Sequence, residues 1–229
     1  MIKTALLLAK KDLTIILGRS AGLCQALLLG LLLIFLFSLS LQNGESLSPH
    51  AASTMFWLAS VFCQVLIFQM LYAVEEQNGA RTGLQTLPCP LQTIWLGKFS
   101  AGIFLLLASQ VLFIPAVFVF LNQHPGEHFL YALFGIFLTD IGICTCGSLL
   151  GALCTGQTGK ESLLSIILFP LLIPLLLSAI SLCSAGLLDL HNPPVQTARI
   201  IQWIGITLAF DFIFSAASLL LFPYLYHGE

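Results

Sequence analysis

Charged side chains are scarce in this 229-residue chain, where Asp, Glu, Lys and Arg together make up 8% of the residues. A typical soluble domain contains about 25% charged residues. No polar stretch between the apolar segments is long enough to fold as a soluble domain. The net charge of −2 says nothing by itself about nucleic-acid or acidic partners, and we expect no nucleic-acid partner for a chain of this class. We therefore predict that residues 1–229 form a single membrane domain, and that any soluble catalytic machinery belongs to another polypeptide.

The chain also lacks the patterns of a disulfide framework and of a redox pair. Of its seven cysteines, six fall within or at the ends of apolar stretches. Cys144 and Cys146 are two residues apart, so they point to nearly opposite faces of a helix and do not form a CxxC pair. Small residues that pack among lipid-compatible side chains are the interpretation favoured for these cysteines.

Nucleotide and metal motifs are incomplete. Residues 154–161 resemble the phosphate-binding loop G-x-x-x-x-G-K-[ST], but Cys154 and Glu161 replace the first Gly and the last Ser or Thr. His124 and His128 have the spacing of a helical ligand pair, but Pro125 lies between them and disfavours a continuous helix. Solvated loop histidines are therefore favoured over a haem or metal site, and we expect no cofactor held by this chain.

What the chain has in abundance is long apolar segments. Six of them exceed the roughly 20 residues that a helix needs to cross a hydrocarbon core of about 30 Å. We predict an all-α integral membrane protein with six transmembrane helices within residues 21–224. They are Ala21–Leu41, Thr54–Val74, Phe99–Leu121, Phe129–Leu153, Ser162–Cys183 and Ile200–Tyr224.

The basic residues outside these segments fall almost entirely on one side of them. Lys3, Lys10, Lys11, Arg19, Arg81, Lys98 and Lys160 lie before the first span or in the second and fourth connections, and Arg199 alone lies on the other side. Because positive residues are enriched in cytoplasmic loops, both termini are predicted to be cytoplasmic.

Residues 1–20 differ from the spans that follow. Ile2, Leu6, Leu13 and Ile16 recur at helical spacing on one face, with Ala5 and Ala9, and lysines gather on the other. This pattern predicts an interfacial elbow helix that lies on the cytoplasmic membrane surface, with its lysines towards anionic lipid head groups. A signal peptide is the alternative, but the apolar run is too long and continues into the first span.

Asp140 and Asp211 are the only acids predicted to lie near the middle of a span, where a charge is costly. One hypothesis is a protonated carboxyl that hydrogen-bonds for helix packing, with Thr139, Thr145 and Ser215 as possible partners. The other is a proton relay.

Proline and glycine predict two local features of the spans. Pro170 and Pro174 each remove a backbone donor, which predicts a kink or local break in the fifth span. Gly147 and Gly151 form a GxxxG surface in the fourth span, suited to close helix approach.

Residues 75–98 contain the most informative motif. Glu75, Gly79, Leu84 and Pro88 resemble the E-x-x-x-G…L-x-x-x-P loop of ABC-2-type transporter permeases. The resemblance implies an ABC-2-type permease architecture with a cytoplasmic coupling loop that docks on a separate ATPase. It implies that Glu75 orients the loop and that Leu84 and Leu87 are apolar contacts. Thr82 departs from the family, which commonly has an acid there. A solvated connection between two helices is the alternative.

Further motifs narrow the resemblance to the haem exporter protein B family of cytochrome c maturation. They are Pro88–Gln92 followed by Leu96–Lys98, the small residues Ile141–Ile143 and Gly147–Leu149, and the double-proline segment Leu163–Leu175. The resemblance implies a permease subunit of the bacterial inner membrane, present in two copies. Its implied partners are a separate ABC ATPase, which binds ATP, and haem-handling membrane subunits that act in c-type cytochrome biogenesis.

Three other functions are compatible with the residues themselves. The chain could be an ABC-2 permease for a lipid or drug, a secondary transporter driven by protons through Asp140 and Asp211, or an assembly scaffold. A co-purifying ATPase would eliminate the secondary transporter.

Overall fold

The computed structural model describes residues 2–18, 20–40, 47–77, 79, 83–84, 86, 89–154, 161–188 and 197–227. Seven helices are assigned within these ranges: α1 (Ile2–Gly18), α2 (Ser20–Leu39), α3 (Pro49–Gln77), α5 (Leu91–Phe120), α6 (Phe129–Cys154), α7 (Glu161–Ala185) and α8 (Thr197–His227). The described part of the chain contains an isolated bridge between Pro125 and Leu187 but no named strand. The prediction of an all-α protein is confirmed for these residues.

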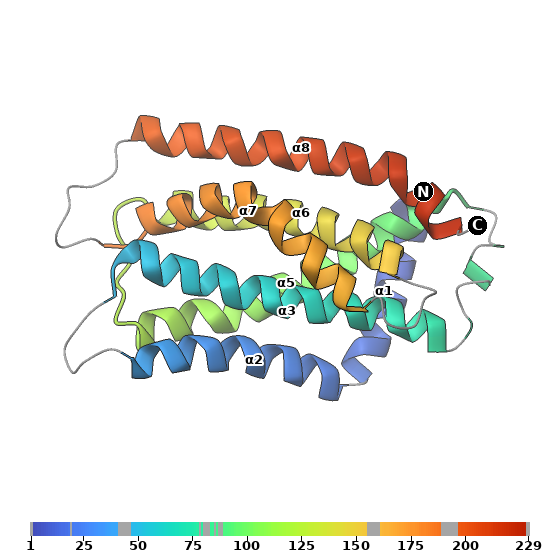
Figure 1. The fold of residues 1–229 in the computed structure, drawn as a ribbon, viewed down its shortest axis with the longest axis horizontal. Helices are drawn as coiled ribbons and strands as arrows, with labels where there is room; N and C mark the ends of the chain where they lie inside the picture. The colour runs from blue at the N-terminus through green and yellow to red at the C-terminus, as the bar shows by residue number, and fades with distance from the viewer. Residues whose placement is uncertain are drawn as a thin grey trace.

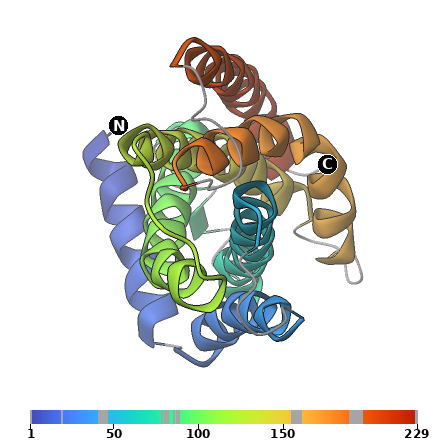
Figure 2. The same ribbon diagram turned by 90° about the vertical axis from the view of Figure 1, so that its left-hand side faces the viewer.

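The helices form a lengthwise bundle with one helix laid across its end. Helices α2, α3 and α5–α8 run along the long axis (Figure 1). Helix α1 is seen along its length in the view in which the bundle helices are seen end-on, so it runs crosswise to them (Figure 2). Both chain termini, the end of α3 and the start of α5 lie at the same end of the bundle as α1 (Figure 1). This end is called the α1 end below.

Five of the lengthwise helices are long and apolar enough to cross a membrane. The qualifying segments are Ala21–Leu39, Pro49–Glu75, Leu91–Phe120, Phe129–Ala152 and Thr197–Leu225. The described apolar part of α7, Pro170–Ala185, is shorter. Large apolar side chains such as Leu28, Leu32 and Leu220 are exposed on the outside of the bundle, as a lipid-facing surface requires. Five candidate spans are thus present, and a sixth crossing by α7 stays a prediction.

The start of α5 corrects one interpretation of the sequence. The third span was expected to begin at Phe99, with Lys98 in the preceding connection. Helix α5 instead begins at Leu91, directly after the extended Pro90, and Lys98 lies inside the helix with 1% of its surface exposed. Pro90 cannot donate a backbone hydrogen bond, so the position before the first helical turn suits it. Lys98 is therefore a buried helical residue, and its charge needs partners within the protein.

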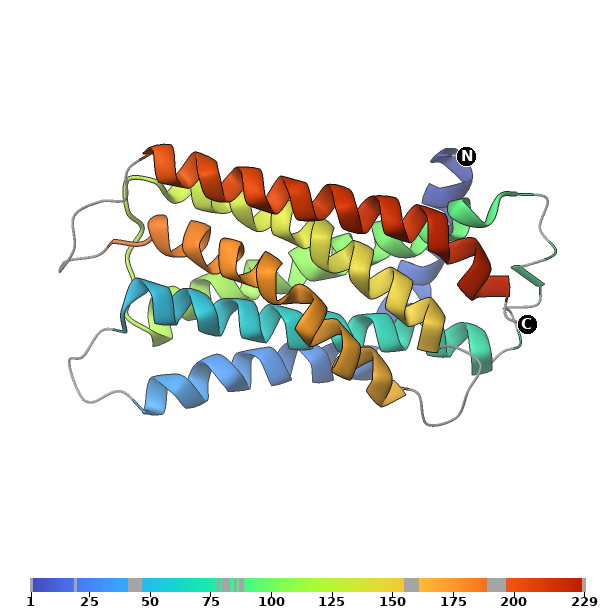
Figure 3. The ribbon, with the colours of Figure 1, turned by 45° about the horizontal axis from the view of Figure 1, so that its top comes forward.

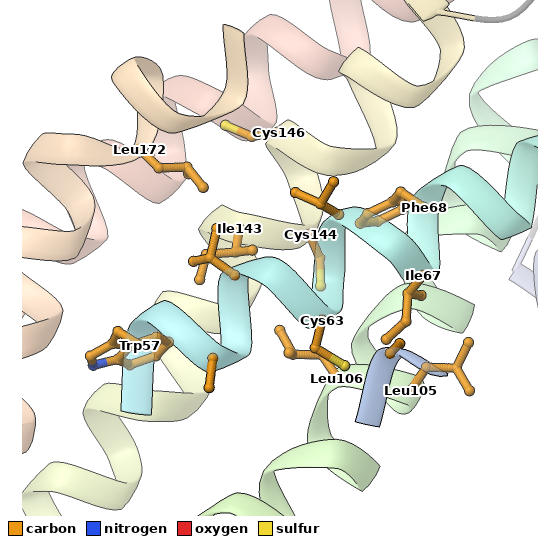
Figure 4. Packing of buried hydrophobic residues seen from close by; sticks show 14 of the residues in the cluster. Trp57, Cys63, Ile67, Phe68, Leu105, Leu106, Ile143, Cys144, Cys146 and Leu172 are labelled. Carbon is orange, nitrogen blue, oxygen red and sulfur yellow. The ribbon is translucent and has the colours of Figure 1, made fainter. Parts of the chain in front are cut away.

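Helix α3 carries much of the core. Its side chains pack against α5, α6 and α7, and the close-up shows Cys63 and Ile67 beside Leu105 and Leu106 of α5 (Figure 4). The GxxxG surface of α6 receives aromatic rings from α3. A Cβ added at Gly147 would overlap the Phe68 ring, and one added at Gly151 would overlap the Tyr72 ring. The two glycines thus make room for rings.

Helix α7 is assigned as one helix through Pro170 and Pro174. It changes direction part-way along its length, where it leans across the neighbouring helices (Figures 1 and 3). An internal proline removes a helical hydrogen bond and clashes with the preceding turn, which is the usual cause of such a bend.

Candidate functional site at the α1 end of the bundle

The predicted coupling residues begin where α3 ends. Glu75 lies in the last turn of α3, and Gly79 and Leu84 follow it. Leu87 and Pro88 lie outside the described residues, so the structure says nothing of them. Gly79 is exposed and has a φ of 61°, in the left-handed region that disfavours residues with a Cβ. A Cβ at Gly79 would meet nothing within 4 Å, so backbone conformation, not space, is what requires glycine there.

Leu84 lies in a different environment from the one that the resemblance implies. Its side chain is 8% exposed and belongs to the buried cluster of the bundle. This burial argues against Leu84 as a contact for a second protein and in favour of an anchor that holds the loop against its own chain.

Glu75 is buried in a cluster of four charged side chains from three helices. Lys98 Nζ of α5 lies 2.6 Å from Glu75 Oε1 of α3 and 3.0 Å from Asp12 Oδ2 of α1. Lys11 Nζ of α1 lies 3.0 Å from Asp12 Oδ1 and 3.4 Å from Glu75 Oε1. These four described side chains are two cations and two anions, so their formal charges cancel. We call these four residues the charge cluster.

Lys98 is the centre of the charge cluster. Besides its two carboxylate partners, its ammonium donates to the backbone carbonyl of Leu71 at 2.7 Å. An ammonium has three N–H donors, and the three contacts match that number. The ammonium also lies 5.2 Å from the centre of the Tyr72 ring, within the range of a cation–π interaction. Removing one partner of such a buried pair costs about 3–5 kcal/mol, because it leaves an uncompensated charge behind.

Lys11 occupies the outer edge of the charge cluster, and its side chain is 38% exposed. Burial lowers the pKa of Lys11, but the Asp12 and Glu75 carboxylates outweigh this effect and leave the pKa raised above the ordinary value of 10.5. A raised pKa stabilises the fold at every pH below the unfolded value, and this contribution is lost only as the pH rises through the folded value. Lys11 therefore stays charged at neutral pH.

Two further contacts connect the charge cluster to the rest of the bundle. The Tyr72 hydroxyl donates to the Ser148 carbonyl of α6 at 2.7 Å. Gly97, next to Lys98, faces α1 so closely that a Cβ there would lie 2.9 Å from Leu8 Cβ and 3.3 Å from the Ala5 carbonyl oxygen. Helix α1 thus packs closely on the backbone of α5 at Gly97, and the Tyr72 hydrogen bond connects α3 to α6.

The buried face of α1 differs from the predicted one. Ala5, Ala9 and Ile16 are buried as expected, but the fourth buried residue is Asp12, and Ile2 and Leu6 are exposed. Sequence reasoning missed both Asp12 and Lys98 as site residues. A signal was present, since Asp12 is the only acid before Glu45 and shares helical spacing with Ala5, Ala9 and Ile16.

The two intramembrane acids lie away from the charge cluster. Asp140 is fully buried and accepts a hydrogen bond from Gln110 Nε2 of α5 at 2.7 Å. Thr139 and Thr145, the partners expected from sequence, donate instead to the carbonyls of Gly135 and Gly142. Among the described residues, neither carboxyl oxygen of Asp211 has a hydrogen-bond partner. Its Oδ1 occupies the space where a Cβ of Gly142 would be.

A comparison with protein families decides the family. The model of a family described as CcmB protein matches residues 3–220. The chain belongs to the CcmB family. The match runs from α1 into α8, so it includes the charge cluster, the residues after α3 and both intramembrane acids. The resemblance to the haem exporter protein B family is thereby confirmed, and the coupling roles of Glu75, Gly79, Leu84, Leu87 and Pro88 stay predictions.

A curated relative of this CcmB family member is similar over most of its length. Heme exporter protein B of Haemophilus influenzae (strain ATCC 51907 / DSM 11121 / KW20 / Rd) is 27% identical over 178 residues, which are 77% of this chain and 80% of that protein. Family membership and the apolar helices together make the chain a multi-pass membrane protein.

Proposed function

We propose that this chain is the permease subunit of an ATP-driven transporter that serves haem export, or the handling of a haem-carrying chaperone, for c-type cytochrome biogenesis. The observation that carries the proposal is the family match over residues 3–220. The name of the relative, a haem exporter, supports the substrate.

ATP is bound and hydrolysed by a separate subunit in this proposal, because the one phosphate-loop-like segment, residues 154–161, lacks two of the motif's key residues. The segment between α3 and α5 is the proposed dock for that ATPase. It follows α3, whose last turn carries Glu75, and the Glu75 carboxylate is held by Lys98. A force applied to this segment would therefore act on α3, which packs through the core of the bundle.

The proposed arrangement in the membrane follows from the ends of the helices. Six helices, α7 included, cross the bacterial inner membrane, with α1 as an elbow helix on the cytoplasmic surface. Support comes from the lysines of α1 and from α1 lying at the same end as both termini (Figure 1). Two copies of the chain, the ATPase and haem-handling membrane subunits complete the proposed complex.

Purification in mild detergent tests the ATPase partnership, and two glycines of the same segment give a matched pair. Gly79→Ala forces a Cβ into the left-handed region, at a cost of about 1–2 kcal/mol. Gly83→Ala adds the same methyl group where no atom lies within 4 Å and φ is not positive. We expect the wild type and Gly83→Ala to co-purify an ATPase and to support cytochrome c maturation, and Gly79→Ala to lose a large part of both.

Two results would contradict the proposal. The absence of any ATPase with the wild-type protein would favour the proton-coupled secondary transporter. Equal ATPase recovery and cytochrome maturation in both glycine variants would remove Gly79 from the coupling segment.

A further inference from the structure

The charge cluster joins a helix that lies across the bundle to the helix that leads into the proposed ATPase dock. Asp12 is contributed by α1 and Glu75 by α3, and both bind the same ammonium, that of Lys98. All three side chains are at most 5% exposed. Within the described residues, the two carboxylates therefore share one buried cation as well as the more exposed Lys11.

A buried link of this kind is stiffer than a surface ion pair. Exposed pairs contribute about 0–1 kcal/mol and separate easily, whereas the Lys98 ammonium has its three donors directed to Asp12, Glu75 and Leu71. Moving Glu75 away from Asp12 would break at least one of the two buried carboxylate contacts of Lys98, which is costly for a buried ammonium. The close packing of Gly97 against Ala5 and Leu8 holds α1 beside the same stretch of α5.

We propose that Asp12 and Lys98 are positioning residues that tie α1 to the end of α3, so that ATP-driven movement of the segment after α3 carries α1 with it. The inference rests on the proposed ATP coupling. It assigns α1 a function beyond membrane association, because α1 then moves together with α3 and α5, the other two helices of the charge cluster. Glu75 then acts through Lys98, and a push on the coupling segment reaches both α5 and α1.

Asp12→Asn is the sharpest substitution, because it keeps the size of the side chain and removes one charge. Lys98 would retain Glu75 and the Leu71 carbonyl, so the end of α3 stays held while the tie to α1 weakens by about tenfold, the loss expected for one charge-assisted hydrogen bond. Thr14→Val is the control, since Thr14 is exposed on α1 and, among the described residues, its hydroxyl donates to the Lys10 carbonyl one turn away. Lys98→Arg is the second variant, because a guanidinium can still bond both carboxylates.

Hydrogen exchange of the ATPase-bound complex in lipid nanodiscs reads the coupling directly. Exchange is compared with and without a non-hydrolysable ATP analogue, for residues 2–18 and for residues 78–90. In the wild type, Thr14→Val and Lys98→Arg, we expect the analogue to change the protection of both segments. In Asp12→Asn we expect the change in residues 78–90 to persist and the change in residues 2–18 to fall by about tenfold.

The possible results separate the two proposals. If residues 78–90 of the wild type do not respond to the analogue, the ATP coupling itself fails. If they respond and α1 does not, or if α1 of Asp12→Asn responds as strongly as that of the wild type, the tie is refuted. A purely structural contribution of Asp12 would raise exchange of α1 equally in both nucleotide states and leave the difference between them intact, which also refutes it. Should Asp12→Asn fail to assemble, loss of the α1 response in Lys98→Arg decides against the tie.

Discussion

Lys98 and Asp211 are both buried charged residues, but they differ in the number of partners that would be lost on substitution. Lys98 lies where α1, α3 and α5 meet, and its three donors have three acceptors. Asp211 belongs to α8 and faces Gly142 of α6, and its carboxyl has no hydrogen-bond partner among the described residues. A network can be broken by one substitution, whereas an isolated carboxyl has no network to lose. The residue of greatest structural consequence is therefore the lysine.

Asp140 is intermediate, and its partner Gln110 makes its substitution predictable. Gln110 Nε2 donates to Asp140 Oδ1, while Gln110 Oε1 and Asp140 Oδ2 have no partner in the described structure. Asp140→Asn keeps the acceptor and adds an N–H that can bond Gln110 Oε1, so we expect thermal stability and cytochrome maturation to be nearly unchanged. Asp140→Leu leaves the buried amide without its partner and should cost about 1–3 kcal/mol.

Thermal unfolding of the purified variants in detergent, together with a cytochrome maturation assay, measures both effects. Asp211→Asn serves as the comparison and is expected to be tolerated with a modest loss. An Asn variant at either position that is inactive although normally folded and assembled would contradict this prediction and favour proton coupling.

At the scale of the helix, sequence pattern predicted the interior of the bundle better than its α1 end. The fourth span was expected at Phe129–Leu153 and α6 is Phe129–Cys154, because an uninterrupted apolar run leaves little freedom in placing its ends. Lys98 was expected outside the third span because one charged residue lowers the mean hydropathy around it, which looks like the end of an apolar segment. Its partners Asp12 and Glu75 are distant in the sequence, and no local pattern encodes their meeting.

Replacing glycine with alanine is expected to change the stability of the protein in opposite directions at the contact between α1 and α5 and at an open position of α8. A Cβ at Gly97 would lie 2.9 Å from Leu8 Cβ, whereas a Cβ at Gly205 in α8 would meet nothing within 4 Å. Gly205→Ala should stabilise the protein by up to about 1 kcal/mol, since Ala is favoured over Gly inside a helix. Gly97→Ala should destabilise it by about 1–3 kcal/mol, because overpacking separates α1 from α5.

Unfolding midpoints of the two variants, measured in the same detergent as the wild type, check these signs. A stabilising Gly97→Ala would show that α1 is not docked on α5 as the structure has it.

For the whole molecule, the arrangement of helix ends agrees with the distribution of basic residues. Helix α1, the end of α3, the start of α5 and both termini share one end (Figure 1), which is the end that the lysines predict to be cytoplasmic. Position 98, a natural choice for a labelling test on sequence grounds, is unsuitable because Lys98 is 1% exposed. Thr86, which is exposed and follows α3, replaces it.

Single cysteines in a cysteine-free background, treated in spheroplasts with a membrane-impermeant maleimide, test this arrangement. His50, His124 and Ala198 are exposed. They lie at the start of α3, between α5 and α6, and at the start of α8, and these helix ends are opposite α1 (Figure 1). We expect His50→Cys, His124→Cys and Ala198→Cys to label in intact spheroplasts, and Thr86→Cys only after lysis. Position 198 decides the sixth span, because the start of α8 is outside only if α7 crosses the membrane. If position 198 is labelled only after lysis, α7 does not cross, and the crossing helices are the five candidate spans that are long enough. If position 86 is labelled in intact spheroplasts, the orientation is the reverse of the proposed one, and the segment after α3 cannot dock on a cytoplasmic ATPase.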